Sequence, residues 1–150
     1  MEKEEKSDTD LEAQEPWRGP RLPADALNLS LAESASRQTE AAIDALERGD
    51  FDVAMTLAGA AEGIIKREGP HLFAWLPDNP RTKERFPEKK DWIALLNRER
   101  DWLKHGGDEH MEIECASAAF MIARAMSKLE VWTPKMDAFK SWLMNNLDSL

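Results

Sequence analysis

The chain has 150 residues, of which 42% are apolar, and it carries a formal net charge of −9. This length and apolar content suit one domain with a buried core. The acidic balance argues against broad electrostatic capture of DNA, which requires a basic surface, although a small local site for one phosphate group stays compatible with it.

The cysteine content and the apolar runs indicate a cytoplasmic protein. Cys115 is the only cysteine, so no disulfide framework can form within the chain. The N-terminus, MEKEEKSDTD, lacks the apolar centre of a secretory signal. The longest mainly apolar stretch, about 113–126, contains two charges and is too short to span a bilayer. We therefore expect a reducing compartment and no membrane association.

Residues 1–23 are predicted to form a disordered acidic tail. They are rich in charge and contain three prolines, a composition that cannot bury enough apolar surface to offset the entropy lost on ordering. Trp17 is the exception, and it could dock onto the body, bind a partner or lie in solvent. The folded domain is expected to cover residues 24–150.

Helical periodicity dominates the rest of the chain, with no alternating strand pattern. Stop and start signals such as Gly49 followed by Asp50, and Thr133 followed by Pro134, separate the helices. The predicted helices cover about 24–48, 51–68, 87–105, 109–131 and a segment from 134 onwards. Short connections predict an all-α, antiparallel bundle of about five helices.

Residues 69–87 form a long connection with four prolines and the apolar run LFAWL. Long ordered loops commonly have a function. Phe73 and Trp75 are therefore candidates for a partner surface, while the alternative is a short helical turn that covers the core.

Metal, cofactor and thiol chemistry have little support in the sequence. His105 and His110 are five residues apart across a Gly-Gly break, and no cysteine pair accompanies them. Cys115 has small apolar neighbours, which favours an inert buried thiol over a nucleophile. No phosphate loop, nucleophile elbow or dinucleotide motif is present. We expect neither a metal nor a cofactor.

The C-terminal half of the third predicted helix carries the strongest chemical pattern. One helix face, opposite the apolar stripe, collects five polar side chains: Asn97, Arg98, Asp101, Lys104 and His105. Asp101 lies one turn before His105 and can contact its imidazole. Arg100 lies at the margin of the apolar stripe, so it meets His105 poorly within one straight helix. The alternative is that these basic residues only complement the helix dipole, with Glu99 and Asp101 in surface ion pairs.

These residue types suit RNA cleavage without a metal. Such cleavage needs a base for the 2′-hydroxyl proton, an acid for the leaving oxygen and a cation for the charge that grows on phosphorus. Histidine can serve either proton role near neutral pH, and arginine offers a planar fork to phosphate oxygens. One histidine per chain fills one role at a time, whereas a dimer brings two.

The segment Arg100-Asp101-Trp102-Leu103-Lys104-His105 resembles the signature of the HEPN superfamily, an arginine, a polar residue, three further residues and a histidine. The stretch ALERGDFDVAMTLAGAAEGII, residues 45–65, looks like the second-helix region of uncharacterised bacterial members, and the resemblance covers roughly 30–135. It implies a four- or five-helix bundle that dimerises around a shared cleft. Many such members are metal-independent endoribonucleases that act as toxins or phage-defence effectors, and others are catalytically dead.

Carried over to this sequence, the resemblance assigns roles to individual residues. Arg100 would bind the scissile phosphate, His105 would act as base or acid, and Asp101 is the polar residue of the motif. Glu62 would be a supporting acid from the second helix, with Lys104 and Asn97 as further supporting residues. The alternative for Glu62 is a surface ion pair with Lys66, four residues later.

Two functions follow from these patterns. The first is a dimeric endoribonuclease that uses Arg100 and His105, with RNA as substrate and a neutralising protein as a further partner. The second is a non-catalytic helical module that binds nucleotides or proteins, and the LFAWL run and the acidic surface motivate it.

Overall fold

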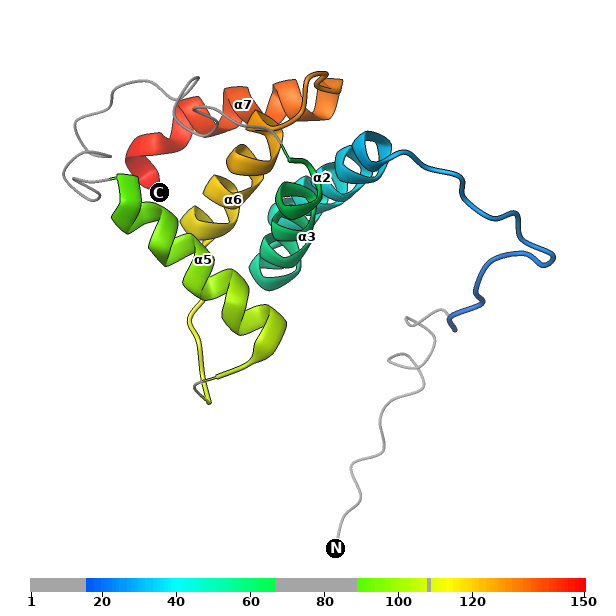
Figure 1. Ribbon diagram of the computed structural model, residues 1–150, viewed down its shortest axis with the longest axis horizontal. Coiled ribbons are helices and arrows are strands. Elements are labelled where there is room, and N and C mark those ends of the chain that lie inside the picture. The colour runs from blue at the N-terminus through cyan, green and yellow to red at the C-terminus, as the bar shows by residue number, and fades with distance from the viewer. Residues whose placement is uncertain (1–15, 67–88, 108) are drawn as a thin grey trace, which may run out of the picture.

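A computed structural model describes residues 16–66, 89–107 and 109–150. Within these ranges the chain is helical and contains no strand, which confirms the predicted all-α class (Figure 1). The elements in chain order are α2 (Leu31–Arg48), α3 (Phe51–Ile64), α5 (Lys89–His105), α6 (Cys115–Ser127), α7 (Pro134–Asn146) and the short 3-10 helix η1 (Leu147–Ser149). None of the helices in these ranges combines the length and apolar character needed to cross a membrane.

Helix α2 begins later than predicted, because its start is set by a side-chain cap. The Ser30 hydroxyl accepts a hydrogen bond from the Glu33 backbone N–H at 3.1 Å, which satisfies an otherwise free donor of the first turn. Residues 16–30 are exposed, contain no helix, and extend away from the bundle (Figure 1). The predicted helix over 24–30 is therefore wrong.

Helices α2 and α3 lie side by side and are joined by the predicted Gly49-Asp50 connection (Figure 1). Gly49 has φ +85°, a left-handed conformation that glycine adopts with least strain. Helix α3 stops at Ile64 because Ile65 is extended. The Lys128 ammonium donates to the Glu62 carbonyl in this last turn at 3.0 Å, so a side chain from another helix satisfies one free carbonyl.

Helix α6 begins at Cys115, six residues after the predicted start. Residues 109–114 are not helical, and burial alternates along 111–114, with Met111 and Ile113 half-buried and Glu112 and Glu114 exposed. A period of two belongs to extended chain, so this short segment follows an extended pattern that the helical prediction overlooked. Asp108, a residue type that commonly caps a helix and would precede a helix from 109, lies outside the described residues.

The core surrounds α6, where every residue from Ala116 to Ala123 is buried. Helices α2, α3 and α6 meet largely through alanines, whose small side chains allow helix axes to approach closely. Larger side chains fill the spaces between them: Met55, Leu96, Met121, Ile122, Met126, Met136 and Leu143. Leu31 and Val53 fit the apolar spacing of their helices but lie exposed.

Helix α7 begins as predicted, with the Thr133 hydroxyl accepting from the Met136 N–H at 3.4 Å and Pro134 in the first turn. Its buried side chains are Met136, Phe139 and Leu143. The fold thus leaves α5 against α3 and α6, with the C-terminal half of α5 at one end of the molecule (Figure 1).

Candidate functional site

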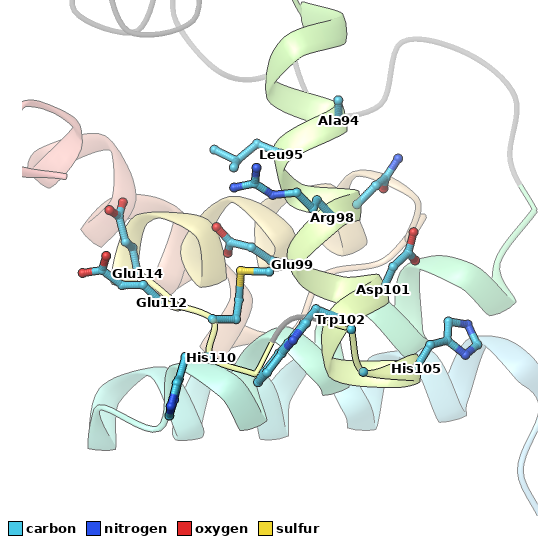
Figure 2. A pocket seen from close by; sticks show the side chains of 14 residues that line it. Ala94, Leu95, Arg98, Glu99, Asp101, Trp102, His105, His110, Glu112 and Glu114 are labelled. Carbon is cyan, nitrogen blue, oxygen red and sulfur yellow. The ribbon is translucent and has the colours of Figure 1, made fainter.

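The C-terminal half of α5 places its polar side chains in two directions. One group turns towards α3 and α6, and the other lines an open cleft beside the connection from α5 to α6 (Figure 2). The helix ends at His105 because Gly106, with φ +77°, leaves the right-handed helical conformation. The Gly106 N–H still donates to the Trp102 carbonyl at 2.7 Å and closes the last turn.

Arg100 belongs to the first group and takes part in a buried ion cluster. Its guanidinium donates to the Glu62 carboxylate at 3.1 Å. The same carboxylate accepts from Arg124 at 3.2 Å and from Lys128 at 2.8 Å, so three cations from α5 and the end of α6 surround one acid from α3. Glu62 is only 4% exposed. The Glu62 cluster, formed by these four residues, therefore joins three helices through charge.

The electrostatics of the cluster keep Glu62 ionised. Burial acts to raise the pKa of the Glu62 carboxyl, because a charge in a low-dielectric interior loses solvation. The hydrogen bond from Lys128 and the charges of Arg124, Lys128 and Arg100 outweigh burial and hold this pKa below its ordinary value. The alternative of a surface pair with Lys66 is wrong, because Glu62 is buried and the helix ends before Lys66.

Gly59 explains how Arg100 reaches Glu62. A Cβ atom at Gly59 would lie 2.8 Å from Cδ and 2.9 Å from Cγ of Arg100, closer than side chains tolerate. The aliphatic part of Arg100 thus crosses α3 directly over this glycine. Gly59 thus permits close packing, and the neighbour that it admits is an arginine side chain.

The other motif residues surround Arg100 without sharing its environment. Asp101 is exposed, and its carboxylate lies 3.6 Å from the Arg100 Nε. Asn97 is half-buried and accepts a hydrogen bond from Arg124 at 2.8 Å, which links it to the Glu62 cluster. Lys104 is exposed. Asp101 thus lies close to Arg100, and Asn97 binds Arg124, and both of these arginines pair with Glu62.

His105 is the last residue of α5 and lies on the surface. Its side chain is exposed and lies with Asp101 on one side of α5, with the ring directed outward (Figure 2). His105 and His110 line the open cleft, whereas Arg100 is not among the described residues that line it. Within the described part of one copy, Arg100 and His105 therefore do not line this cleft together, which is compatible with their spacing on the helix.

Glu99 was not predicted as a site residue, and the suggestion that it forms a surface pair is wrong. It is 3% exposed, and one of its carboxylate oxygens accepts a hydrogen bond from the Ser117 hydroxyl at 3.1 Å. Its other oxygen, Oε2, is buried and accepts no hydrogen bond from the described part of the chain. Burial raises the pKa of Glu99, and the nearby Glu114 charge adds to this, while the Ser117 hydrogen bond and Arg98 oppose it.

Helical spacing contained a signal for Glu99. It lies three residues after Leu96, a fully buried residue, and so belongs to the same helix face. A glutamate within a run of polar residues is nevertheless predicted to be exposed to solvent, because buried glutamates are uncommon. The partner hydroxyl, Ser117, is 18 residues away and cannot be found from local spacing.

Cys115 is half-buried, and burial raises the pKa of its thiol, so the side chain is held in the unreactive protonated form. The predicted partner-surface residues Phe73 and Trp75 lie outside the described residues.

Chemically, α5 offers a guanidinium oriented by Glu62 and, five residues later, an exposed imidazole. No family model, curated protein or solved structure matches the chain.

Proposed function

We propose that this chain is a HEPN-like, metal-independent endoribonuclease that acts as a cytoplasmic dimer in a toxin or phage-defence role. The observation that carries the proposal is the position of Arg100, held by the buried Glu62 at 3.1 Å, five residues before an exposed histidine at the end of the same helix. The HEPN-like, antiparallel arrangement of the helices is part of this proposal.

The Glu62 cluster suits Arg100 for binding a phosphate. Its three cations exceed the single buried carboxylate in charge, and 27% of the Arg100 side chain stays exposed. A guanidinium that is already oriented loses little entropy when it binds an anion, and it stays charged at every relevant pH. Arg100 would therefore neutralise the charge that grows on the scissile phosphate.

His105 supplies the proton chemistry. Its imidazole removes the proton of the 2′-hydroxyl, the 2′-oxygen attacks phosphorus, and the bond from phosphorus to the 5′-oxygen breaks. The leaving oxygen takes a proton from a second imidazole. The products are a 2′,3′-cyclic phosphate and a 5′-hydroxyl, and neither a metal nor an added water enters this step.

A second copy of the chain completes the site. Because five residues separate Arg100 and His105 by about 140° around an ideal helix, and Arg100 is not among the described residues that line the cleft beside His105, a shared site would require two motif helices to face each other. Such a pairing brings the second imidazole that the proton transfers require. A two-fold axis would present the same residues from both copies.

RNA cleavage in the presence of a chelator tests the proposal. The purified protein is expected to cleave RNA in EDTA and to leave 2′,3′-cyclic phosphate ends. His105→Ala should abolish cleavage with an unchanged melting temperature, because the imidazole is exposed. Arg100→Lys, which can still pair with Glu62, should reduce cleavage at least about tenfold because the guanidinium fork is lost. Lys66→Ala removes an exposed charge elsewhere and serves as the control.

Cleavage that persists in the His105→Ala protein would remove His105 from the mechanism. Cleavage that requires a divalent cation would contradict the metal-independent reaction.

One observation favours the second candidate, a non-catalytic interaction module. The guanidinium of Arg100 already pairs with Glu62 and Asp101, which is also what a purely structural arginine would do. In that case Trp75→Ala should weaken a protein complex while RNA stays intact in every preparation. Recovery of no partner protein at native expression levels would count against the module.

A further inference from the structure

The cleft beside the connection from α5 to α6 is lined by a buried carboxylate, that of Glu99, which the proposed cleavage does not use. Glu99 contributes to its lining, and the cleft has a volume of about 1090 Å³, enough for a small organic ligand or a side chain of another protein. Figure 2 shows Glu99 on the side of α5 where Glu112 and Glu114 also lie, with Trp102 below them.

The free oxygen of Glu99 is the feature that points to a ligand. A buried oxygen without a hydrogen-bond partner destabilises the fold, because folding removes the hydrogen bonds that water made to it and no protein donor replaces them. Among the described residues Oε2 accepts no hydrogen bond, while Oε1 is fixed by Ser117. Glu99 is also among the residues that line the cleft, so its carboxylate belongs to the wall that a ligand would meet.

The charge of the cleft selects the sign of the ligand. On the Glu99 side of α5 the lining includes two further carboxylates, from Glu112 and Glu114, and the guanidinium of Arg98, whereas Asp101 and His105 lie on the other side of the helix (Figure 2). Beside Glu99 an anion would be repelled, and a cation that carries N–H groups would both offset this charge and donate to Glu99. The half-buried Trp102 offers an indole edge or face to the aliphatic stem of such a cation.

We propose that this cleft binds the head of an organic cation, a guanidinium or a primary ammonium on an aliphatic stem, with Glu99 as the acceptor at its base. Such a head is carried both by small amines and by arginine or lysine side chains of other proteins. The inference goes beyond the proposed cleavage, and binding is measured without RNA, so it holds or fails independently of nuclease activity.

Calorimetric titration of the full-length protein at pH 8 tests the site, with n-butylguanidinium, agmatine and the neutral analogue n-butylurea as probes. The two cations are expected to bind, and n-butylurea at least about tenfold more weakly, because it lacks the charge. Glu99→Gln should weaken binding of the cations at least about tenfold. Glu47→Gln removes the same charge from an exposed position on α2 and should change the affinity less than about twofold.

Equal affinity in the wild-type and Glu99→Gln proteins would overturn the proposal. So would an equal loss in the Glu47→Gln control, equal binding of n-butylurea, or binding of Mg²⁺ or Ca²⁺ with no binding of either amine. If Glu99→Gln does not fold, the wild-type protein provides the test. Binding should then tighten as the pH rises above 4.5, with release of a proton, because the cation requires an ionised Glu99 whose pKa is raised in the folded protein.

A blocked Gly-Arg-Gly peptide separates the two sources of the cation. Tighter binding of the peptide than of agmatine assigns the cleft to a side chain of a partner protein, and the reverse order assigns it to a small amine.

Discussion

Two buried glutamates, Glu62 of α3 and Glu99 of α5, link α5 to its neighbouring helices and are stabilised in opposite ways. Glu62 is surrounded by three cations, and its pKa is lowered. Glu99 receives one neutral hydroxyl, and its pKa is raised. Both are almost completely buried, so burial alone does not decide the charge state of a carboxyl.

The different surroundings of Glu62 and Glu99 indicate different roles for the two carboxylates. A carboxylate whose charge is fully compensated fixes its partners, and Glu62 therefore orients Arg100. A carboxylate with a spare oxygen in the wall of a cleft is available to a ligand, and Glu99 therefore fits a recognition role. Their removal should consequently have opposite effects on stability.

The largest effect is expected for Glu62→Ala. Removing the carboxylate leaves three partly buried cations facing one another, and breaking a buried ion pair in this way typically lowers the free energy of unfolding by about 3–5 kcal/mol. Urea denaturation measures the loss. Glu47→Ala, at an exposed position of α2, should stay within about 0.5 kcal/mol of the wild type. A loss below about 1 kcal/mol for Glu62→Ala would mean that the cluster does not hold α3, α5 and α6 together.

An intermediate effect is expected for Gly59→Ala, because the new methyl group would displace the Arg100 side chain. Overpacking of this kind costs about 1–3 kcal/mol. Gly63→Ala is the matched control in the same helix, since nothing lies within 4 Å of its Cβ position, and it should stabilise the protein by about 0.5–1 kcal/mol. In an Arg100→Ala background, Gly59→Ala should lose its penalty. Equal effects of Gly59→Ala in both backgrounds would show that Arg100 does not pack on Gly59.

The smallest effect concerns the pH dependence of stability, and it has opposite signs for the two acids. Because the pKa of Glu62 is lowered by folding, the unfolded chain binds more protons than the folded chain. The contribution of Glu62 to the free energy of unfolding is therefore complete above pH 4.5 and is lost as the pH falls through the folded pKa. The raised pKa of Glu99 means that the folded chain binds more protons, so its contribution falls as the pH rises above 4.5.

Glu99→Gln isolates the second contribution, because the amide mimics the protonated acid and keeps an acceptor for Ser117. The variant should be more stable than the wild type at pH 8, by about 1 kcal/mol, and the difference should disappear near pH 4. Thermal denaturation at several pH values provides the comparison. A Glu99→Gln protein that is less stable than the wild type at pH 8 would contradict the description of Glu99 as an uncompensated acid.

Much of the helical architecture could be predicted from local signals. The end of α2 at Gly49 follows from backbone conformation and the start of α7 at Thr133-Pro134 from capping, which depend on neighbouring residues. Asp50 precedes α3 as expected, but its side chain makes no cap hydrogen bond. The starts of α2 and α6 were placed too early, because Ser30 caps the first and an extended stretch precedes the second. Helical periodicity alone does not fix where a helix begins.

The site was less predictable, because its contacts join distant parts of the chain. Spacing on α5 located the exposed residues Asp101, Lys104 and His105, and it predicted that Arg100 and His105 diverge. The partners that define the two acids lie far away in sequence: Arg100 is 38 residues from Glu62, and Ser117 is 18 residues from Glu99. Such long-range pairs depend on the packing of whole helices.

Cleavage by mixtures of wild-type and His105→Ala protein tests most directly whether two copies form one active site. The two proteins are mixed at constant total concentration, allowed to exchange subunits, and assayed on RNA in EDTA. If one cleft needs the imidazole of both copies, activity follows the square of the wild-type fraction, and an equal mixture retains about a quarter of full activity. Activity proportional to the wild-type fraction, about half in the equal mixture, would show that each chain cleaves alone and would contradict the shared cleft.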